Sequence, residues 1–160
     1  MPLLHEALTK RVIDIFYDVY AELGHGFLEK VYQSAMVIAL TEAGLSVAQK
    51  VPYEVWFRER LIGEFIVDIV VNACLLLELK AAAGLNSWDD AQALNYLRAS
   101  PLEVALIMNF GPRPEYRRRI FTNDRKTPAT RRVRLARPAR SVTNEAGLVD
   151  LSDPRRSSDY

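Results

Sequence analysis

Residues 64–80 read EFIVDIVVNACLLLELK and contain the longest apolar run of the chain, Ile66 to Leu77. Successive residues of a strand point to opposite faces, so neighbouring strands that are apolar on both faces indicate the buried centre of a sheet. In the first strand the alternation places Val67 and Ile69 on one face and Asp68 on the other, between aliphatic neighbours. A carboxylate in such a place needs a partner.

The second strand, residues 74–80, adds Glu78 and Lys80, which project to one side, one pleat apart. Three ionisable groups on two buried strands are costly unless they compensate one another or bind an ion. The carboxylates outnumber the lysine, and a divalent cation between them would relieve their repulsion. Oxygen ligands favour Mg²⁺ or Mn²⁺ over Zn²⁺. The alternative, a buried ionic network that only stabilises the sheet, stays open.

Elements on either side complete the predicted fold. Apolar residues at helical spacing predict helices over 3–23 and 27–43, the second ending at a left-handed Gly44. Residues rich in β-branched and aromatic side chains predict separate strands at 45–51 and 53–57, followed by a turn and the strand 61–72. Ser87 and Asp90 have capping-box spacing and begin a third helix, and strands follow at 102–110 and 115–121.

The connections between these elements decide the fold class. The turn at residues 58–60 is too short for a crossover, so the strands beside it must be antiparallel. The helix between Lys80 and Leu102 allows a crossover to a parallel strand. We therefore expect an α/β fold with a mixed central sheet flanked by helices.

Length and composition exclude several classes. The 160 residues suffice for one domain with a sizeable core. Cys74 is the single cysteine, which excludes an internal disulfide, and with only two histidines it also excludes a zinc site made of Cys and His alone. No apolar run has the length of a membrane span, and the N-terminus does not resemble a signal peptide. We expect a soluble, cytoplasmic protein with no membrane partner.

Charge is distributed unevenly along the chain. Residues 1–112 carry 8 basic and 14 acidic side chains, whereas residues 113–160 carry 13 and 6. We expect a folded domain over residues 1–123 and a basic, flexible tail over 124–160, which is rich in Arg and Pro and poor in large apolar residues. A basic tail favours contact with a polyanion, but a solvated tail that serves solubility is an equal alternative.

Two helices carry further candidates. Gly26, Glu29 and Tyr32 follow one another at intervals of three residues, so Glu29 and Tyr32 can share a helix face. A glutamate there also complements the helix dipole, which is the simpler explanation. Gln92 and Tyr96 form an i, i+4 pair that is typical of a surface or interhelical contact.

Together these residues resemble a known family. Residues 26–32, GFLEKVY, match the motif that names the GxxExxY protein family. Asp68 followed by Glu78-Leu79-Lys80 resembles the D…ExK core of the PD-(D/E)XK nuclease-like superfamily, to which that family is assigned. Residues 92–97 and 108–111 resemble its later Q-x-x-N-Y-L and N-F-G stretches, so the resemblance spans about residues 8–121.

The resemblance implies a restriction-endonuclease-like fold and a set of roles. It implies that Asp68, Glu78 and Glu29 bind Mg²⁺ or Mn²⁺, with the Leu79 carbonyl as a further oxygen. Lys80 would orient or help to deprotonate the attacking water and stabilise the phosphate. Gln92 would hold the site's geometry or contact substrate. Supporting roles fall to Tyr32, Tyr96 and Gly26.

We therefore expect a Mg²⁺- or Mn²⁺-dependent nuclease that hydrolyses phosphodiester bonds in nucleic acid, because a carboxylate-held cation and a lysine supply what that reaction needs. Arginines of the basic region are candidates for phosphate contacts: Arg117, Arg118, Arg119, Arg131, Arg132 and Arg134. Two alternatives remain: a catalytically silent nuclease-like domain that binds nucleic acid or protein, and a purely structural acidic cluster.

Overall fold

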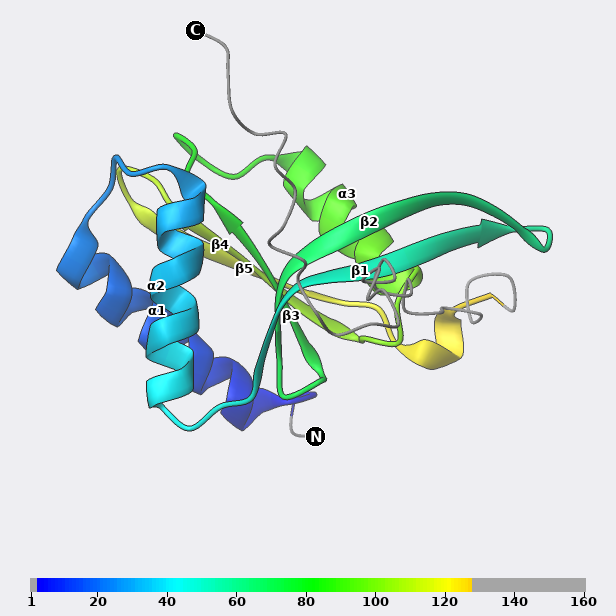
Figure 1. Cartoon of the computed structure of the whole chain (residues 1–160), viewed down its shortest axis with the longest axis horizontal. Helices are drawn as coiled ribbons and strands as arrows, with labels where there is room; N and C mark the ends of the chain where they lie inside the picture. The colour runs from blue at the N-terminus through cyan, green and yellow to red at the C-terminus, as the bar shows by residue number, and fades with distance from the viewer. Residues whose placement is uncertain (1–2, 128–160) are drawn as a thin grey trace, which may run out of the picture.

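The computed structural model describes residues 3–127, so most of the predicted tail 124–160 lies outside the described part. Its elements are α1 (Glu6–Leu23), α2 (Glu29–Glu42), β1 (Val47–Phe57), β2 (Arg60–Val71), β3 (Leu75–Lys80), α3 (Ser87–Arg98), β4 (Val104–Phe110), β5 (Pro114–Ile120) and the short 3-10 helix η1 (Asn123–Arg125). The strands form one sheet in chain order, antiparallel except for the parallel pair β3–β4 (Figure 1). The expected mixed, helix-flanked α/β fold is confirmed.

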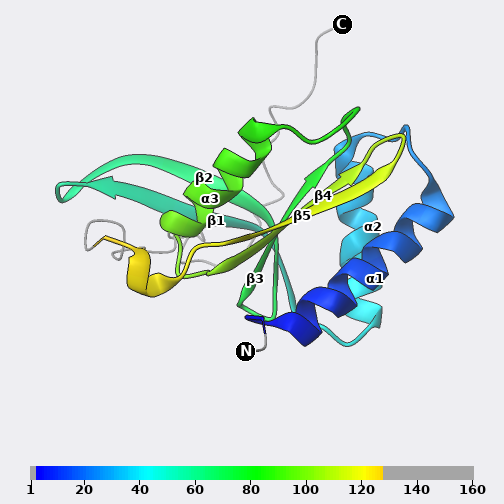
Figure 2. The same ribbon diagram turned by 180° about the vertical axis from the view of Figure 1, so that it is seen from behind.

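The helices cover the two faces of the sheet and divide the core in two. Helices α1 and α2 pack on one face, where Phe16, Met36 and Leu40 meet the odd-numbered residues of β3. Helix α3 packs on the other, where Ala93 and Leu97 meet Leu76 and Ile107, among others (Figure 2). No helix within residues 3–127 is long and apolar enough to cross a membrane.

The first strand and the cap of α3 differ from the prediction. The strands expected at 45–51 and 53–57 are one strand, β1, because Pro52 pairs with Ile66 without ending it. Strand β1 lies at the sheet edge, where a residue without an N–H is tolerated. The capping box at α3 uses Asn86 and Asp89, one residue earlier than the Ser87–Asp90 pair expected. Asn86 has the extended backbone of an N-cap and accepts from the Trp88 and Asp89 amides, at 2.8 and 3.3 Å.

The remaining elements are present as expected, with bounds that differ by at most three residues. The first two helices begin two or three residues later than expected, and Gly44 follows α2 with φ 79°. Its amide donates to Thr41 and that of Leu45 to Leu40, which is the Schellman arrangement. Arg58 and Glu59 form the tight turn between β1 and β2. These two strands make a long hairpin that extends beyond the other strands (Figure 1).

Candidate active site

Glu78 and Lys80 lie at the end of β3, a central strand between β2 and β4. Both belong to the α3 side, as the alternation predicts. Glu78 is 6% exposed, and within the described residues its Oε1 has no hydrogen-bond partner. Burial, followed by the nearby Asp68 charge, raises the pKa of Glu78 from 4.5 to about 8. An unpaired buried carboxylate oxygen is costly, so this site favours a proton or a cation.

Asp68 lies where β2 separates from β3, just beyond the last paired residues, Ile69 and Leu77. Its Oδ2 accepts from the Leu79 amide at 3.2 Å, and its Oδ1 lies 3.3 Å from Lys50 Nζ. The predicted common face of Val67 and Ile69 is wrong, because Val67 packs in the α3-side core and Ile69 in the opposite one. The change occurs at Asp68, which points its carboxylate towards the end of β3.

Glu29 is the first residue of α2, and the loop before it brings it to the same place. The pKa of Glu29 is raised by burial and by Asp68 and lowered by Lys80 and by a hydrogen bond from the Ala81 backbone. Glu29 therefore joins Asp68, Glu78 and Lys80. The four residues come from three elements and form what we call the acidic cluster.

The glycine and tyrosine of the Gly26–Tyr32 motif shape that loop. Gly26 has φ 110°, a conformation that favours glycine. The buried Tyr32 hydroxyl donates to the Gly24 carbonyl at 2.7 Å and accepts from the Phe27 amide at 3.2 Å. Its ring stacks on Phe110, with centroids 4.3 Å apart. Tyr32 thus supports the loop that positions Glu29.

Lys80 is held by α3. Its Nζ donates to Gln92 Oε1 at 3.0 Å, and Gln92 Nε2 donates to the Tyr96 hydroxyl at 3.1 Å. The Tyr96 ring stacks on Phe65, with centroids 4.2 Å apart and planes 5° apart. Asp89 lies 3.7 Å from Lys80 Nζ. The predicted Gln92–Tyr96 pair therefore serves Lys80.

Asn109 and Gly111, which the sequence analysis did not select, fix the loop after β3. The Asn109 side chain accepts from the Ala82 amide at 2.9 Å and donates to the Ala82 carbonyl at 3.0 Å. A Cβ on Gly111 would lie 2.1 Å from that carbonyl oxygen. The resemblance of residues 108–111 to the N-F-G stretch was the sequence signal that could have identified them. The sequence analysis also missed three residues for which the sequence offers no comparable signal: Lys50, Gln33 and Asp89.

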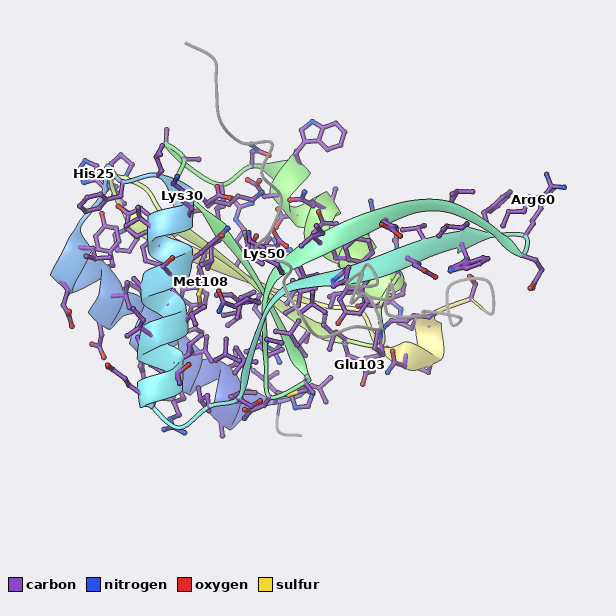
Figure 3. The ribbon with its side chains drawn as sticks, viewed as in Figure 1. His25, Lys30, Lys50, Arg60, Glu103 and Met108 are labelled. Carbon is purple, nitrogen blue, oxygen red and sulfur yellow. The ribbon has the colours of Figure 1, made fainter. Side chains whose placement is uncertain are left out.

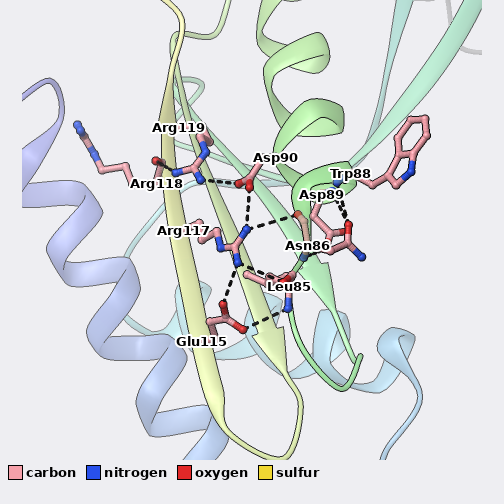
Figure 4. Close-up of polar contacts among 9 residues, drawn as sticks. All are labelled: Leu85, Asn86, Trp88, Asp89, Asp90, Glu115, Arg117, Arg118 and Arg119. Carbon is pink, nitrogen blue, oxygen red and sulfur yellow. Dashed lines mark hydrogen bonds and ion pairs between the residues drawn. The ribbon is translucent and has the colours of Figure 1, made fainter.

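Three of the six candidate arginines, Arg117, Arg118 and Arg119, lie within the described residues and make internal contacts (Figure 4). Arg117 pairs with Asp90 at 2.7 Å and Glu115 at 3.4 Å, and Arg119 pairs with Asp90 at 2.6 Å. Arg118 donates to the Leu4 carbonyl. These contacts hold β5 to the start of α3 and to the chain before α1. The other three candidates, Arg131, Arg132 and Arg134, lie outside the described residues.

The donors fit a hard divalent cation in their chemistry. Within residues 3–127, no three His, Cys, Asp or Glu side chains have the spacing of a ready-made metal site. Asp68 is instead paired with Lys50 and with the Leu79 amide. Glu29, Asp68 and Glu78 nevertheless supply only oxygen donors, mutually repelling charges and one buried oxygen that has no hydrogen-bond partner in the described part of the chain. Oxygen donors of this kind suit a hard divalent cation.

Comparison with known proteins agrees with this geometry. A family model described as the PD-(D/E)XK nuclease superfamily matches residues 6–120, from the first residue of α1 to the last of β5. The comparisons with curated proteins and with solved structures found no match. The matched segment contains the whole acidic cluster and all five strands.

Proposed function

This chain belongs to the PD-(D/E)XK nuclease superfamily, and we propose that it is a Mg²⁺- or Mn²⁺-dependent nuclease that hydrolyses phosphodiester bonds. The observation that carries the proposal is the buried Glu78 carboxyl, whose Oε1 has no hydrogen-bond partner among residues 3–127, beside Asp68 and one pleat from Lys80. A fold that needed only stability would gain from an uncharged residue here. Nuclease chemistry accounts for an ionisable residue at this position.

Glu29, Asp68 and Glu78 are the residues that would hold the cation. When bound, a divalent cation supplies an activated water and compensates charge on the phosphoryl oxygens. The cluster residues come from rigid elements: Asp68 and Glu78 from neighbouring strands and Glu29 from the first turn of α2. The pinned loops before Glu29 and after Lys80 keep the ligands in place.

Lys80 is proposed to orient the attacking water and to stabilise charge on the phosphate. Its side chain is 22% exposed, so the ammonium can reach substrate while Gln92 restricts its direction. A positioned cation of this kind is worth more in a partly dry site than in water. Gln92 and Tyr96 act through Lys80 and are positioning residues.

A panel of labelled single-stranded DNA, double-stranded DNA and RNA, incubated with Mg²⁺, Mn²⁺ or EDTA, tests the proposal. Wild type should cleave at least one substrate with Mn²⁺ and none with EDTA. Lys80→Ala should lose ~10²-fold or more, as loss of a charge-stabilising group typically does. Lys30→Ala, which removes an exposed lysine of α2, should keep activity.

Two results separate this proposal from its alternatives. Equal cleavage by wild type and Lys80→Ala would assign the activity to something other than this site. Binding of nucleic acid without cleavage in any metal would favour a silent nuclease-like binding domain.

A further inference from the structure

Lys50 has a backbone conformation that ordinary strand residues avoid. Its φ is 50°, although it lies inside β1. The other non-glycine residues with positive φ within 3–127 are in tight turns or at the start of α1: His5, Arg58, Glu59, Asn72 and Ala73. Such conformations cluster at functional sites and persist only where the surroundings hold them.

The β1–β2 ladder is interrupted at this residue. Gln49 pairs with Ile69 and Val51 pairs with Val67, but Lys50 and Asp68, which face each other between these pairs, are not partners in the backbone ladder. This is also where the sidedness of β2 changes. The irregularity in β1 therefore turns the Lys50 side chain towards the acidic cluster.

The Lys50 ammonium lies between α2 and β2 (Figure 3). Its Nζ is 2.8 Å from Gln33 Oε1 and 3.3 Å from Asp68 Oδ1. Gln33 follows Glu29 by one helical turn, and Lys50 lowers the pKa of Glu29. The Lys50 side chain is 59% exposed and that of Asp68 is 13% exposed, so the lysine can leave while the carboxylate stays.

Resting on the nuclease function proposed above, we infer that Lys50 is a second phosphate-binding lysine that occupies Asp68 until a divalent cation replaces it. Lys80 cannot take this place, because Gln92 and Asp89 hold it on the α3 side. With a cation bound, the negative charge of Asp68 would be compensated without Lys50. The flexible lysine stem then carries its charge to a phosphate of the bound nucleic acid.

The inference distinguishes Lys50 from a structural ion pair by its effect on metal affinity. A lysine that competes with the cation makes metal binding weaker, so its removal tightens binding. Removal of a lysine that only maintains the structure of the site should weaken metal binding, because the ligands lose their arrangement.

Calorimetric titration of the full chain with Mn²⁺, without nucleic acid, tests this step. Lys50→Met should bind Mn²⁺ about three- to fivefold more tightly than wild type, the effect of removing one partly exposed ion pair. Lys30→Met, which removes an exposed lysine beside Glu29, is the matched control and should change affinity less. Gln33→Ala keeps the charge but frees the lysine, so it should shift affinity in the same direction as Lys50→Met.

Fluorescence anisotropy of a labelled single-stranded oligonucleotide tests the second step. In a Lys80→Ala background with saturating Mn²⁺, adding Lys50→Met should weaken binding and reduce the salt slope by about one. Unchanged or weaker Mn²⁺ affinity of Lys50→Met, or an unchanged salt slope, would overturn the inference alone. No Mn²⁺ binding by wild type would overturn the proposed function as well.

Discussion

Substitution of Glu78 by Gln should make the metal-free protein more stable and its stability less dependent on pH. The variant keeps the side-chain shape and removes a charge that is buried beside Asp68 and Glu29. The pKa of Glu78 is about 8 in the folded protein against 4.5 in the reference state, so folding favours the protonated form. Gln is a permanent analogue of that form.

The size of the effect follows from linkage. Between pH 4.5 and about 8 the folded chain binds a proton that the unfolded chain has released, so stability falls as pH rises. Each pH unit is worth ~1.4 kcal/mol, which gives ~5 kcal/mol over the full interval. Wild type and Glu78→Gln should therefore unfold alike near pH 4.5 and diverge by several kcal/mol near pH 8.

Urea unfolding in EDTA at several pH values between 4.5 and 8 measures the difference. Glu64→Gln, which removes an exposed carboxylate of β2, is the control and should follow wild type. Curves for wild type and Glu78→Gln that run parallel across the whole range would refute the reasoning. Mn²⁺ should restore stability to wild type, increasingly at higher pH, because binding requires the ionised carboxylate.

Three further outcomes follow from the described contacts. Asp68→Asn should leave the metal-free melting temperature nearly unchanged. Wild type should be stabilised by ~2.7 kcal/mol at a Mn²⁺ concentration 100 times its Kd, and the variant should lose most of this stabilisation. Destabilisation of the metal-free variant, with no Mn²⁺ response in wild type, would favour the structural network. Gly111→Ala should cost ~1–3 kcal/mol in chemical denaturation, because its Cβ would lie 2.1 Å from the Ala82 carbonyl, whereas Gly84→Ala has open space and should be neutral. Truncation after Thr127 should keep the melting temperature and reduce the salt slope of nucleic-acid binding. Truncation after Asn123 should also destabilise the folded domain, because Lys126 donates to the Ser100 and Leu102 carbonyls at 2.7 Å. Equal melting temperatures of the two truncated proteins would assign Lys126 no structural role.

The part of the site that follows strand periodicity could be predicted from the sequence. Period-two alternation placed Glu78 and Lys80 on one side of their strand, and the i, i+4 spacing of Gln92 and Tyr96 placed these two on one helix face, where the structure has them hydrogen-bonded. These relations depend on one element at a time. Local geometry alone was therefore enough to predict them.

The contacts that join distant elements could not be predicted in this way. Lys50 contacts Asp68 of the acidic cluster because its own irregular backbone interrupts the ladder opposite Asp68, and no pattern in the sequence reports that φ value. Arg117 and Arg119 read as free positive charge, but both form ion pairs with Asp90 once β5 packs beside α3, and Arg117 pairs with Glu115 as well. Tertiary packing decides these pairs.

Mn²⁺-dependent cleavage by wild type and Lys80→Ala, purified identically and compared on the same labelled nucleic acid, tests the central claim most directly. We predict cleavage by wild type that EDTA abolishes and that Lys80→Ala lowers by ~10²-fold or more. No cleavage by wild type of any substrate in the panel, or equal rates for the two proteins, would contradict it.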